Sequence, residues 1–215
     1  MATFGYTTAP SANGDTNNYV MWFKAQSAPA SNGALTSITM QNCTIVSGTD
    51  TLLVALYSDD GGSPSHPANL LASISSGGGA ISVGNYGNTT SNLSYASLTA
   101  GAQYWFAVMT STYSNILYYY FDSSGTGINF TTNSFYYSGA AVSAFPATAS
   151  GGTLYSECAG LYATYTPSGG GADWRKEGYW WDNPYNGRNR YWRPRKSSIF
   201  RPKRGGSPDL WRKAA

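Results

Sequence analysis

The sequence predicts an all-β protein: an antiparallel β-sandwich with jelly-roll or Greek-key connections, followed by an extended, non-globular C-terminal arm. Through residues 1–166 the apolar residues recur with period two over short stretches, and clusters of Gly, Ser, Asn, Asp and Pro separate these stretches. No stretch there sustains the apolar stripe of a helix. From residue 173 onward the charge and the aromatic content change abruptly, which sets the arm apart.

The predicted strands are rich in Thr, Tyr and Val, the residues that suit a pleated, half-buried surface. They are residues 19–25, 35–40, 51–57, 70–74, 93–98, 104–110, 116–121, 133–137 and 154–165. Turn signals rich in Gly, Asn, Asp and Pro separate them, at residues 31–33, 58–64, 99–101 and 122–125. Many short antiparallel strands bury their alternating faces most simply in two packed sheets, with an open barrel as the alternative.

Charge divides the chain into a domain, a linker and an arm. Residues 1–172 contain one basic residue, Lys24, and six acidic residues, for a net charge of −5. Residues 173–215 contain twelve basic and four acidic residues, for a net charge of +8. Between these parts, Pro167 and Ser168 precede three glycines, a composition typical of a flexible connector. We therefore predict a β-sandwich domain over 1–166, a linker over 167–172 and an arm over 173–215.

The side chains that carry most enzyme chemistry are scarce. The chain has one His and two Cys, which leaves few groups to transfer protons, attack carbonyls or hold metals. His66 lies between prolines in a predicted loop, and no Gly-x-Ser-x-Gly motif accompanies it. We predict that the protein is not an enzyme and that it has no catalytic residue, no cofactor and no metal site.

Two pairs of residues have competing interpretations. Asp59 and Asp60, which precede two glycines, could offer oxygen ligands to calcium, but their spacing does not match an EF-hand loop and favours a tight turn.

Cys43 and Cys158 could form a disulfide that closes a long loop and stabilises the fold by about 4 kcal/mol. The first residues lack the charged start and apolar stretch of a signal peptide, which favours free, buried thiols in a reducing compartment.

Two tyrosine-rich runs, residues 118–121 and 135–137, fall on predicted strands. Period two turns alternate rings toward the core, so the outward half forms a candidate contact surface. This surface consists of Tyr118, Tyr120 and Tyr136. Exposed aromatic rings stack against sugars or pack against a protein neighbour, and both interpretations stay open.

The arm has the composition of an interface. Trp, Tyr and Arg are the residue types of binding hot spots, and they are concentrated in the arm. The predicted aromatic anchors are Trp174, Trp180, Trp181, Tyr185, Tyr191, Trp192, Phe200 and Trp211. The predicted basic contacts are Arg175, Arg188, Arg190, Arg193, Arg195, Lys196, Arg201, Lys203 and Arg204. Prolines and glycines prevent a long helix, which leaves an extended strap that cannot build its own core.

Three kinds of partner suit such an arm, and neighbouring protein subunits rank first. Trp and Tyr would fill their pockets while Arg pairs with carboxylates, among them those on the acidic domains of sister copies. Nucleic acid ranks second, because residues 192–196 and 201–204 interleave basic side chains with aromatic residues or proline. A membrane ranks last, since the arm lacks amphipathic periodicity and no run approaches the roughly 20 apolar residues of a membrane helix.

Residues 33–39, 53–64, 70–72 and 98–107 carry a family resemblance. Together they resemble a jelly-roll module of bacteriophage virion proteins and of some bacterial surface proteins, and the likeness covers most of residues 15–165. The resemblance implies a decoration, fibre or adhesin unit without catalytic residues, in which homo-oligomers and especially trimers are common. Its Gly, Pro and Trp positions are turn and core positions, so it indicates the fold more than the role.

These observations lead to one expected function and two alternatives. We expect a non-enzymatic structural protein of a tailed bacteriophage virion, made in the host cytoplasm. In this role a capsid decoration or cement protein would display its jelly-roll domain and fasten itself to neighbouring subunits by its arm. The alternatives are a tail or fibre attachment protein, and a carbohydrate-binding or adhesin module.

Overall fold

The structure, a computed structural model of the whole chain, describes residues 1–10, 20–74, 76–93, 96–112, 115–122, 144–149 and 152–168 with their side chains. It describes the backbone alone at residues 14–17, 135–137, 178–182 and 190–194. The chain divides into two compact units, Met1–Ser168 and Gly169–Ala215. We call the first unit the body and the second the arm unit, and describe each by itself.

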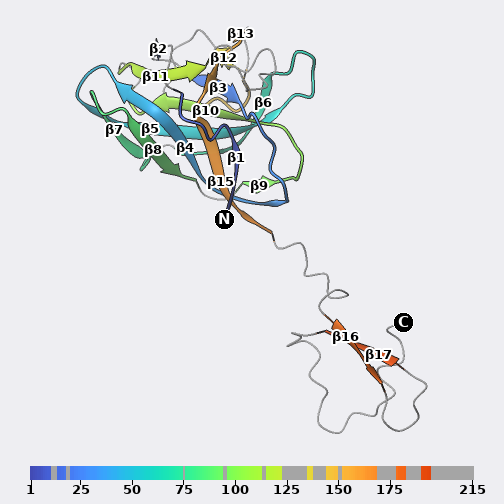
Figure 1. The fold of residues 1–215 in the computed structure, drawn as a ribbon. Helices are drawn as coiled ribbons and strands as arrows, with labels where there is room; N and C mark the ends of the chain where they lie inside the picture. Colours follow the sequence, from blue (N-terminus) through green and yellow to red (C-terminus); the bar gives the residue numbers. More distant parts are fainter. Residues whose placement is uncertain are drawn as a thin grey trace. The chain divides into compact units, whose positions relative to one another are not determined.

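All regular structure in the described residues is β, and every ladder is antiparallel, as the sequence predicted (Figure 1). The eight-stranded sheet of the body has the order β1 (Ala2–Gly5), β15 (Leu161–Pro167), β4 (Gly33–Ile45), β11 (Leu117–Asp122) and β14 (Cys158–Ala159). In this first sheet β2 (Gly14–Asn17) also pairs with β11, and β8 (Gly87–Asn92) and β9 (Ser97–Leu98) pair with β4.

The seven-stranded sheet is the second layer of the body. Its order is β13 (Thr153–Tyr155), β12 (Phe135–Tyr137), β3 (Met21–Lys24), β10 (Tyr104–Thr110), β5 (Thr49–Asp59) and β6 (Pro67–Ser73), with β7 (Gly79–Ser82) also on β5. None of the described residues forms a helix long and apolar enough to cross a membrane.

Four ladders in the body are nested in sequence. The outermost joins β1 to β15, the next joins β3 to β10, the third joins β4 to β8, and the innermost joins β5 to β6. The first and third ladders lie in one sheet and the second and fourth in the other. Two further ladders, β15 with β4 and β10 with β5, connect them within each sheet. The body is therefore paired as one long hairpin, and its successive ladders alternate between the two sheets.

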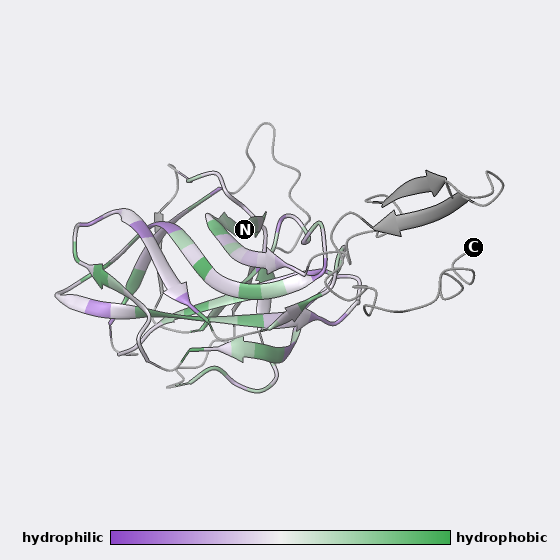
Figure 2. Cartoon of the chain, turned by 90° about the horizontal axis from the view of Figure 1, so that it is seen from below, coloured by the Kyte–Doolittle hydropathy of each residue, from purple (hydrophilic) through white to green (hydrophobic). Residues whose placement is uncertain are grey.

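One apolar core lies between the two sheets. Its side chains come from alternate positions of strands in both layers, and its largest members include Phe4, Phe23, Phe106, Tyr119 and Tyr165. Figure 2 shows hydrophobic and hydrophilic residues alternating along the long strands of the body. This period-two burial explains why these stretches form strands, and it gives the body a sandwich-like arrangement.

The outer face of the second sheet is also buried. Every residue of β10 is buried because Trp105, Ala107 and Met109 enter a second apolar cluster on that face. Phe145 and Ala149, from residues 144–149, pack against this cluster. The Tyr57 hydroxyl donates a hydrogen bond to the Pro146 carbonyl over 2.6 Å, which fastens the covering segment to the sheet. The body thus has a second, smaller core that the alternation alone did not predict.

The predicted strands overlap observed ones, but only three lie wholly within them, and the number and bounds of the strands differ. Residues 104–110 form β10 as predicted, and residues 35–40 and 51–57 lie inside the longer β4 and β5. The prediction over 93–98 was wrong, since β8 ends at Asn92 and β9 comprises only Ser97–Leu98. The predicted strand over 154–165 divides among β13, β14 and β15, and β1, β2, β7 and β8 were not predicted.

The arm unit contains regular structure within the extended strap that was expected. Its backbone forms an antiparallel pair between β16 (Gly178–Asp182) and β17 (Arg190–Pro194), in which Trp180 is the partner of Trp192. Pro184 and Gly187 were interpreted only as helix breakers, yet Asn, Pro and Gly between two aromatic stretches are also a turn signal. These two stretches of the arm therefore form a strand pair that the sequence analysis did not predict.

Candidate interaction surface

The tyrosine run of β11 is divided between the two faces of the first sheet. Tyr119 is fully buried and lies edge-on to Phe23, with ring centroids 5.5 Å apart. Its hydroxyl donates a 3.4 Å hydrogen bond to a carboxylate oxygen of Glu157. Tyr118 and Tyr120 are only half-buried and point to the outer face. The predicted alternation is confirmed for these three residues.

Tyr86, in the turn before β8, completes a cluster of three rings on this outer face. Its ring centroid lies 5.7 Å from that of Tyr118 and 5.3 Å from that of Tyr120, and the two β11 rings are 5.7 Å apart. Tyr118 stands edge-on to both neighbours, with interplanar angles of 82° and 87°. The Tyr86 side chain is 48% exposed. The sequence analysis missed it because a single Tyr in a Gly- and Asn-rich turn has no period to reveal it.

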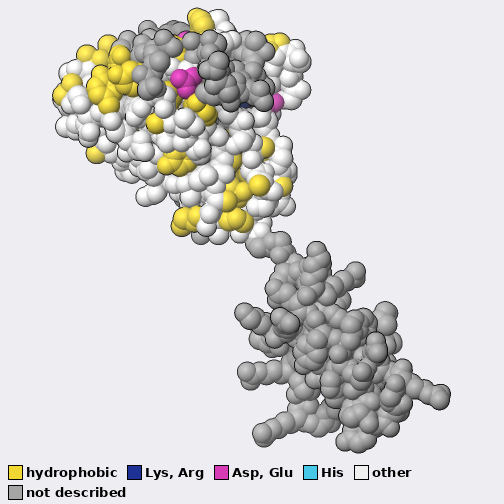
Figure 3. Space-filling model, in the orientation of Figure 1, with side chains coloured by type: hydrophobic (Ala, Val, Ile, Leu, Met, Phe, Trp, Pro, Cys, Tyr) yellow, Lys and Arg dark blue, Asp and Glu magenta, His cyan; other side chains and the backbone are white. Residues whose placement is uncertain are grey.

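Two exposed valines lie in the turns beside these rings. Val46 is 53% exposed, and its N–H donates to the carbonyl of Ile116, immediately before β11. Val83 is 54% exposed, and its N–H donates to the carbonyl of Gly48 in the β4–β5 turn. Figure 3 shows hydrophobic side chains gathered at the upper left of the body, where Figure 1 places β11 and the end of β4. We call Val46, Val83, Tyr86, Tyr118 and Tyr120 the tyrosine patch.

Acidic residues lie at both ends of β11. At its start, Asp50 accepts a 3.1 Å hydrogen bond from the side-chain amide of Asn115 and another from the Ser111 hydroxyl. At its end, Asp122 accepts a 2.8 Å hydrogen bond from the Tyr6 hydroxyl, and Glu157 lies beside the buried Tyr119. All three carboxylates are half-buried. Negative charge therefore lies at both ends of β11, with Glu157 on the side of the inward-facing Tyr119.

The environment of these acidic residues is reflected in their pKa values and in those of their partners. Burial would raise the pKa of Asp50, but the hydrogen bonds from Ser111, Thr51 and Asn115 outweigh burial and hold that pKa below its usual value. Burial, followed by the hydrogen bond to Asp122, raises the pKa of Tyr6 to about 12. Both groups therefore keep their ordinary charge states near neutral pH.

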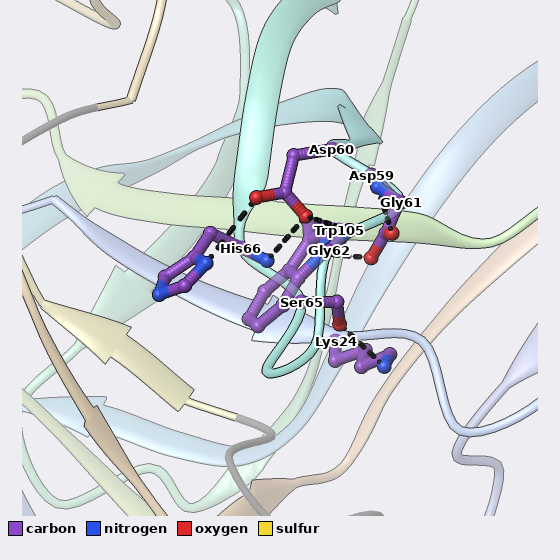
Figure 4. Close-up of polar contacts among 8 residues, drawn as sticks. All are labelled: Lys24, Asp59, Asp60, Gly61, Gly62, Ser65, His66 and Trp105. Carbon is purple, nitrogen blue, oxygen red and sulfur yellow. Dashed lines mark hydrogen bonds and ion pairs between the residues drawn. The ribbon is translucent and has the colours of Figure 1, made fainter.

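Hydrogen bonds to its own aspartate side chains hold the Asp59–His66 loop in place (Figure 4). Asp60 accepts hydrogen bonds from the backbone N–H of His66 and of Gly62, each over 2.9 Å, and these hold its pKa below the usual value. Asp59 accepts a 2.8 Å hydrogen bond from the Trp105 indole. The two carboxylates are thus engaged in the turn, as the turn interpretation predicted. Within the described ranges no three His, Cys, Asp or Glu side chains gather in a way that could hold a metal ion.

Both cysteines are free and buried in the body. Burial raises the pKa of the Cys43 thiol to about 11. Burial and then the nearby charge of Asp122 raise the pKa of the Cys158 thiol to about 12. A thiol that stays protonated is a poor nucleophile. The prediction of free thiols is confirmed, and neither thiol has the properties of a reactive cysteine.

The remaining predicted contact residues lie where side chains are not described. Tyr136 lies on β12, of which the backbone alone is described, and pairs with Trp22 of β3 and Leu154 of β13. Strands β16 and β17 carry Trp180, Trp181, Arg190, Tyr191, Trp192 and Arg193, again with the backbone alone described. Outside the described residues lie Trp174, Arg175, Tyr185, Arg188, Arg195, Lys196, Phe200, Arg201, Lys203, Arg204 and Trp211.

No protein-family model matches the sequence, and no curated protein matches it significantly.

Proposed function

We propose that the protein is a non-enzymatic structural protein of a bacteriophage virion, and that its arm fastens its jelly-roll body to neighbouring subunits. In this role it is a capsid decoration or cement protein, and attachment to a tail or fibre is the alternative position. The observation that carries the proposal is the division of charge and aromatic residues between the two units. Residues 1–172 have a net charge of −5, and residues 173–215 have a net charge of +8 and five of the seven Trp residues.

The nested ladders support the jelly-roll assignment. A jelly roll is an eight-stranded double sheet made of two Greek keys, and it arises when one long hairpin is rolled over two layers. Numbered in chain order, the eight strands of the four nested ladders are β1, β3, β4, β5, β6, β8, β10 and β15. They follow the order one, eight, three, six in the first sheet and two, seven, four, five in the second. Strands β11 to β14 form an insertion between the seventh and eighth strands under this assignment.

The composition of the arm supports a fastening role. Trp, Tyr and Arg supply large buried contacts and bidentate pairing with carboxylates, and acidic sister bodies offer such carboxylates. Each arm residue whose backbone becomes ordered only on assembly costs roughly 1–2 kcal/mol, which the buried aromatic rings must offset.

Truncation tests the proposal. Both described core clusters consist of residues between Phe4 and Tyr165, so a chain that ends at Ser168 keeps them. We expect the truncated chain to remain folded by circular dichroism and to be absent from phage particles into which the labelled full-length chain incorporates. Incorporation of both chains at equal occupancy would contradict the fastening role. Binding of the full-length chain to DNA, with an affinity that falls steeply with salt, would instead indicate nucleic acid as the partner of the arm.

A second candidate function is carbohydrate binding, and the cluster of Tyr86, Tyr118 and Tyr120 favours it. Rings exposed on one face of a sheet are the kind of surface that stacks against sugars. A glycan array distinguishes the two functions, because an adhesin would retain glycans through these rings. A cement protein would retain none, and the variants Tyr86→Ser and Tyr120→Ser would then leave the array unchanged.

A further inference from the structure

We infer that the tyrosine patch is the docking site for the basic arm, residues 173–215, of a second copy of this chain. The inference rests on the proposed function and deepens it, because it names the surface that receives the arm. The patch joins three exposed side chains, Val46, Val83 and Tyr86, to the half-buried rings of Tyr118 and Tyr120 on the outer face of the first sheet. Contiguous exposed apolar residues of this kind mark interaction sites.

The chemistry of the patch suits the arm. The ring centroids of Tyr86, Tyr118 and Tyr120 lie 5.3–5.7 Å from one another, so an incoming planar group meets several rings at once. Arg guanidinium groups stack on Tyr faces through cation–π attraction, and indole rings pack against exposed aliphatic side chains such as Val46 and Val83. The arm contains eight Arg and five Trp residues.

Charge complementarity also favours the arm as the occupant. Three of the six acidic residues of the body, Asp50, Asp122 and Glu157, lie at the two ends of β11. A fourth, Asp15, lies on β2, which pairs with β11. The single basic residue of the body, Lys24, is on the second sheet, where its ammonium group donates to the Ser65 hydroxyl. The surroundings of the patch therefore attract a segment with a charge of +8.

The position where the chain leaves the body keeps the first anchor of the arm, Trp174, from its own patch, whereas Trp192, 24 residues beyond Ser168, lies far enough along the chain to reach either copy. Pro167 pairs with Gly33, at the first residue of β4, and the N–H of Ser168 donates to the carbonyl of Asn32. The patch lies at the other end of β4, where Thr44 pairs with Tyr118. At about 3.3 Å per residue, the length of β4 separates the two ends by roughly 35–40 Å. Trp174 is only six residues beyond Ser168 and reaches at most about 21 Å, so this anchor cannot return to its own patch.

The test uses two full-length variants that should each fail to self-associate. The patch variant carries Tyr86→Ser, Tyr118→Ser and Tyr120→Ser, and the arm variant carries Trp192→Ser, Arg193→Ser and Arg195→Ser. A matched control carries Leu71→Ser and Tyr155→Ser, since these side chains are 42% and 44% exposed on the second sheet. Sedimentation velocity gives the association constant of each chain, and circular dichroism checks that each is folded.

The two variants should each raise the dissociation constant for self-association at least about tenfold, and the control should leave it unchanged. An equimolar mixture of patch variant and arm variant should form mixed dimers, because one chain supplies an intact arm and the other an intact patch. Raising the salt concentration should weaken all of these complexes.

Three outcomes would overturn the inference. The patch variant could associate like the wild type, the mixture could stay monomeric although each variant is folded, or the patch could bind a glycan with self-association unaffected. If the proposed function is wrong and the arm does not fasten subunits together, the result is different: the arm variant then associates as tightly as the wild type. Loss of association in the arm variant alone would keep the proposed function and remove only this docking site.

Discussion

The two sheets of the body each carry aromatic side chains on their outer face, but only one of these faces is covered by a described segment of the chain. On the second sheet Trp22, Tyr57 and Trp105 are fully buried, because residues 144–149 pack over them. On the first sheet Tyr86, Tyr118 and Tyr120 keep part of their surface exposed. The aromatic residues of the second sheet therefore stabilise the body by full burial, whereas those of the first sheet keep part of their surface on the outside of the body.

The difference lies in hydrogen bonding as well as in burial. On the covered face the Trp105 indole donates a hydrogen bond to Asp59, and the Tyr57 hydroxyl donates one to the Pro146 carbonyl. The polar groups of these two buried rings therefore have hydrogen-bond partners within the body. On the exposed face the described contacts of Tyr86 are with other tyrosine rings. Rings that lie outside both core clusters and keep part of their surface exposed stabilise the fold less by burial than the fully buried rings of the second sheet.

The largest expected effect is on the covered face. Trp105→Ala removes a fully buried indole and leaves a cavity beside Trp22 and Tyr57, and it also leaves Asp59 without this donor. We expect the free energy of unfolding to fall by about 3–5 kcal/mol. Urea denaturation followed by circular dichroism measures the change. A loss below about 1 kcal/mol would mean that the second cluster is not a core.

A smaller effect is expected where the covering segment is fastened. Tyr57→Phe keeps the ring and removes the hydroxyl that donates to the Pro146 carbonyl. Loss of this bond should lower the free energy of unfolding by about 0.5–1.5 kcal/mol. The segment 144–149 should also become more susceptible to protease. Unchanged proteolysis with unchanged stability would show that apolar packing alone holds the segment in place.

Acid should destabilise the start of β11 through Asp50. The pKa of this carboxyl is lower in the folded protein than its unfolded value of about 3.9, so its stabilising effect is present above that value. This stabilisation is lost as the pH falls through the lower, folded pKa. Asp50→Asn should therefore reduce the pH dependence of stability below about pH 4. A variant with the same acid profile as the wild type would show that the hydrogen bonds of Asp50 contribute nothing.

The smallest effect is expected on the exposed face. Tyr118→Ser and Tyr120→Ser together should change the free energy of unfolding of the isolated monomer by less than about 1 kcal/mol, because neither ring is in the core. The measurement is urea denaturation at a concentration where the chain is monomeric. A loss as large as that of Trp105→Ala would remove the distinction between the two faces.

The sequence predicts the all-β class and the strands with apolar alternation, because apolar residues at every second position are typical of a strand that buries one face. It does not predict β8, whose residues Gly-Asn-Thr-Thr-Ser-Asn include no apolar side chain. That strand is held by polar contacts instead: the Ser91 hydroxyl donates to the Leu52 carbonyl and accepts from the Gly79 N–H, each over 2.8 Å. Such long-range contacts leave no periodic signal in the sequence.

The candidate surface was predictable in part for the same reason. Tyr118 and Tyr120 follow from alternation around the buried Tyr119, whereas Tyr86 joins them only through the pairing of β8 with β4 and of β4 with β11. The pairing of β16 with β17 was missed because Pro184 and Gly187 were weighed as helix breakers and not as parts of a turn. In both cases the missing information is which distant segments lie side by side.

Site-specific photocrosslinking tests the central claim most directly. A full-length chain with a benzophenone amino acid in place of Tyr118 is mixed with an isotopically labelled wild-type chain, irradiated and analysed by peptide mass spectrometry. Our account predicts crosslinks from position 118 to residues 173–215 of the labelled copy, and their loss at high salt. Crosslinks confined to the same copy, or to the body of the second copy, would contradict it.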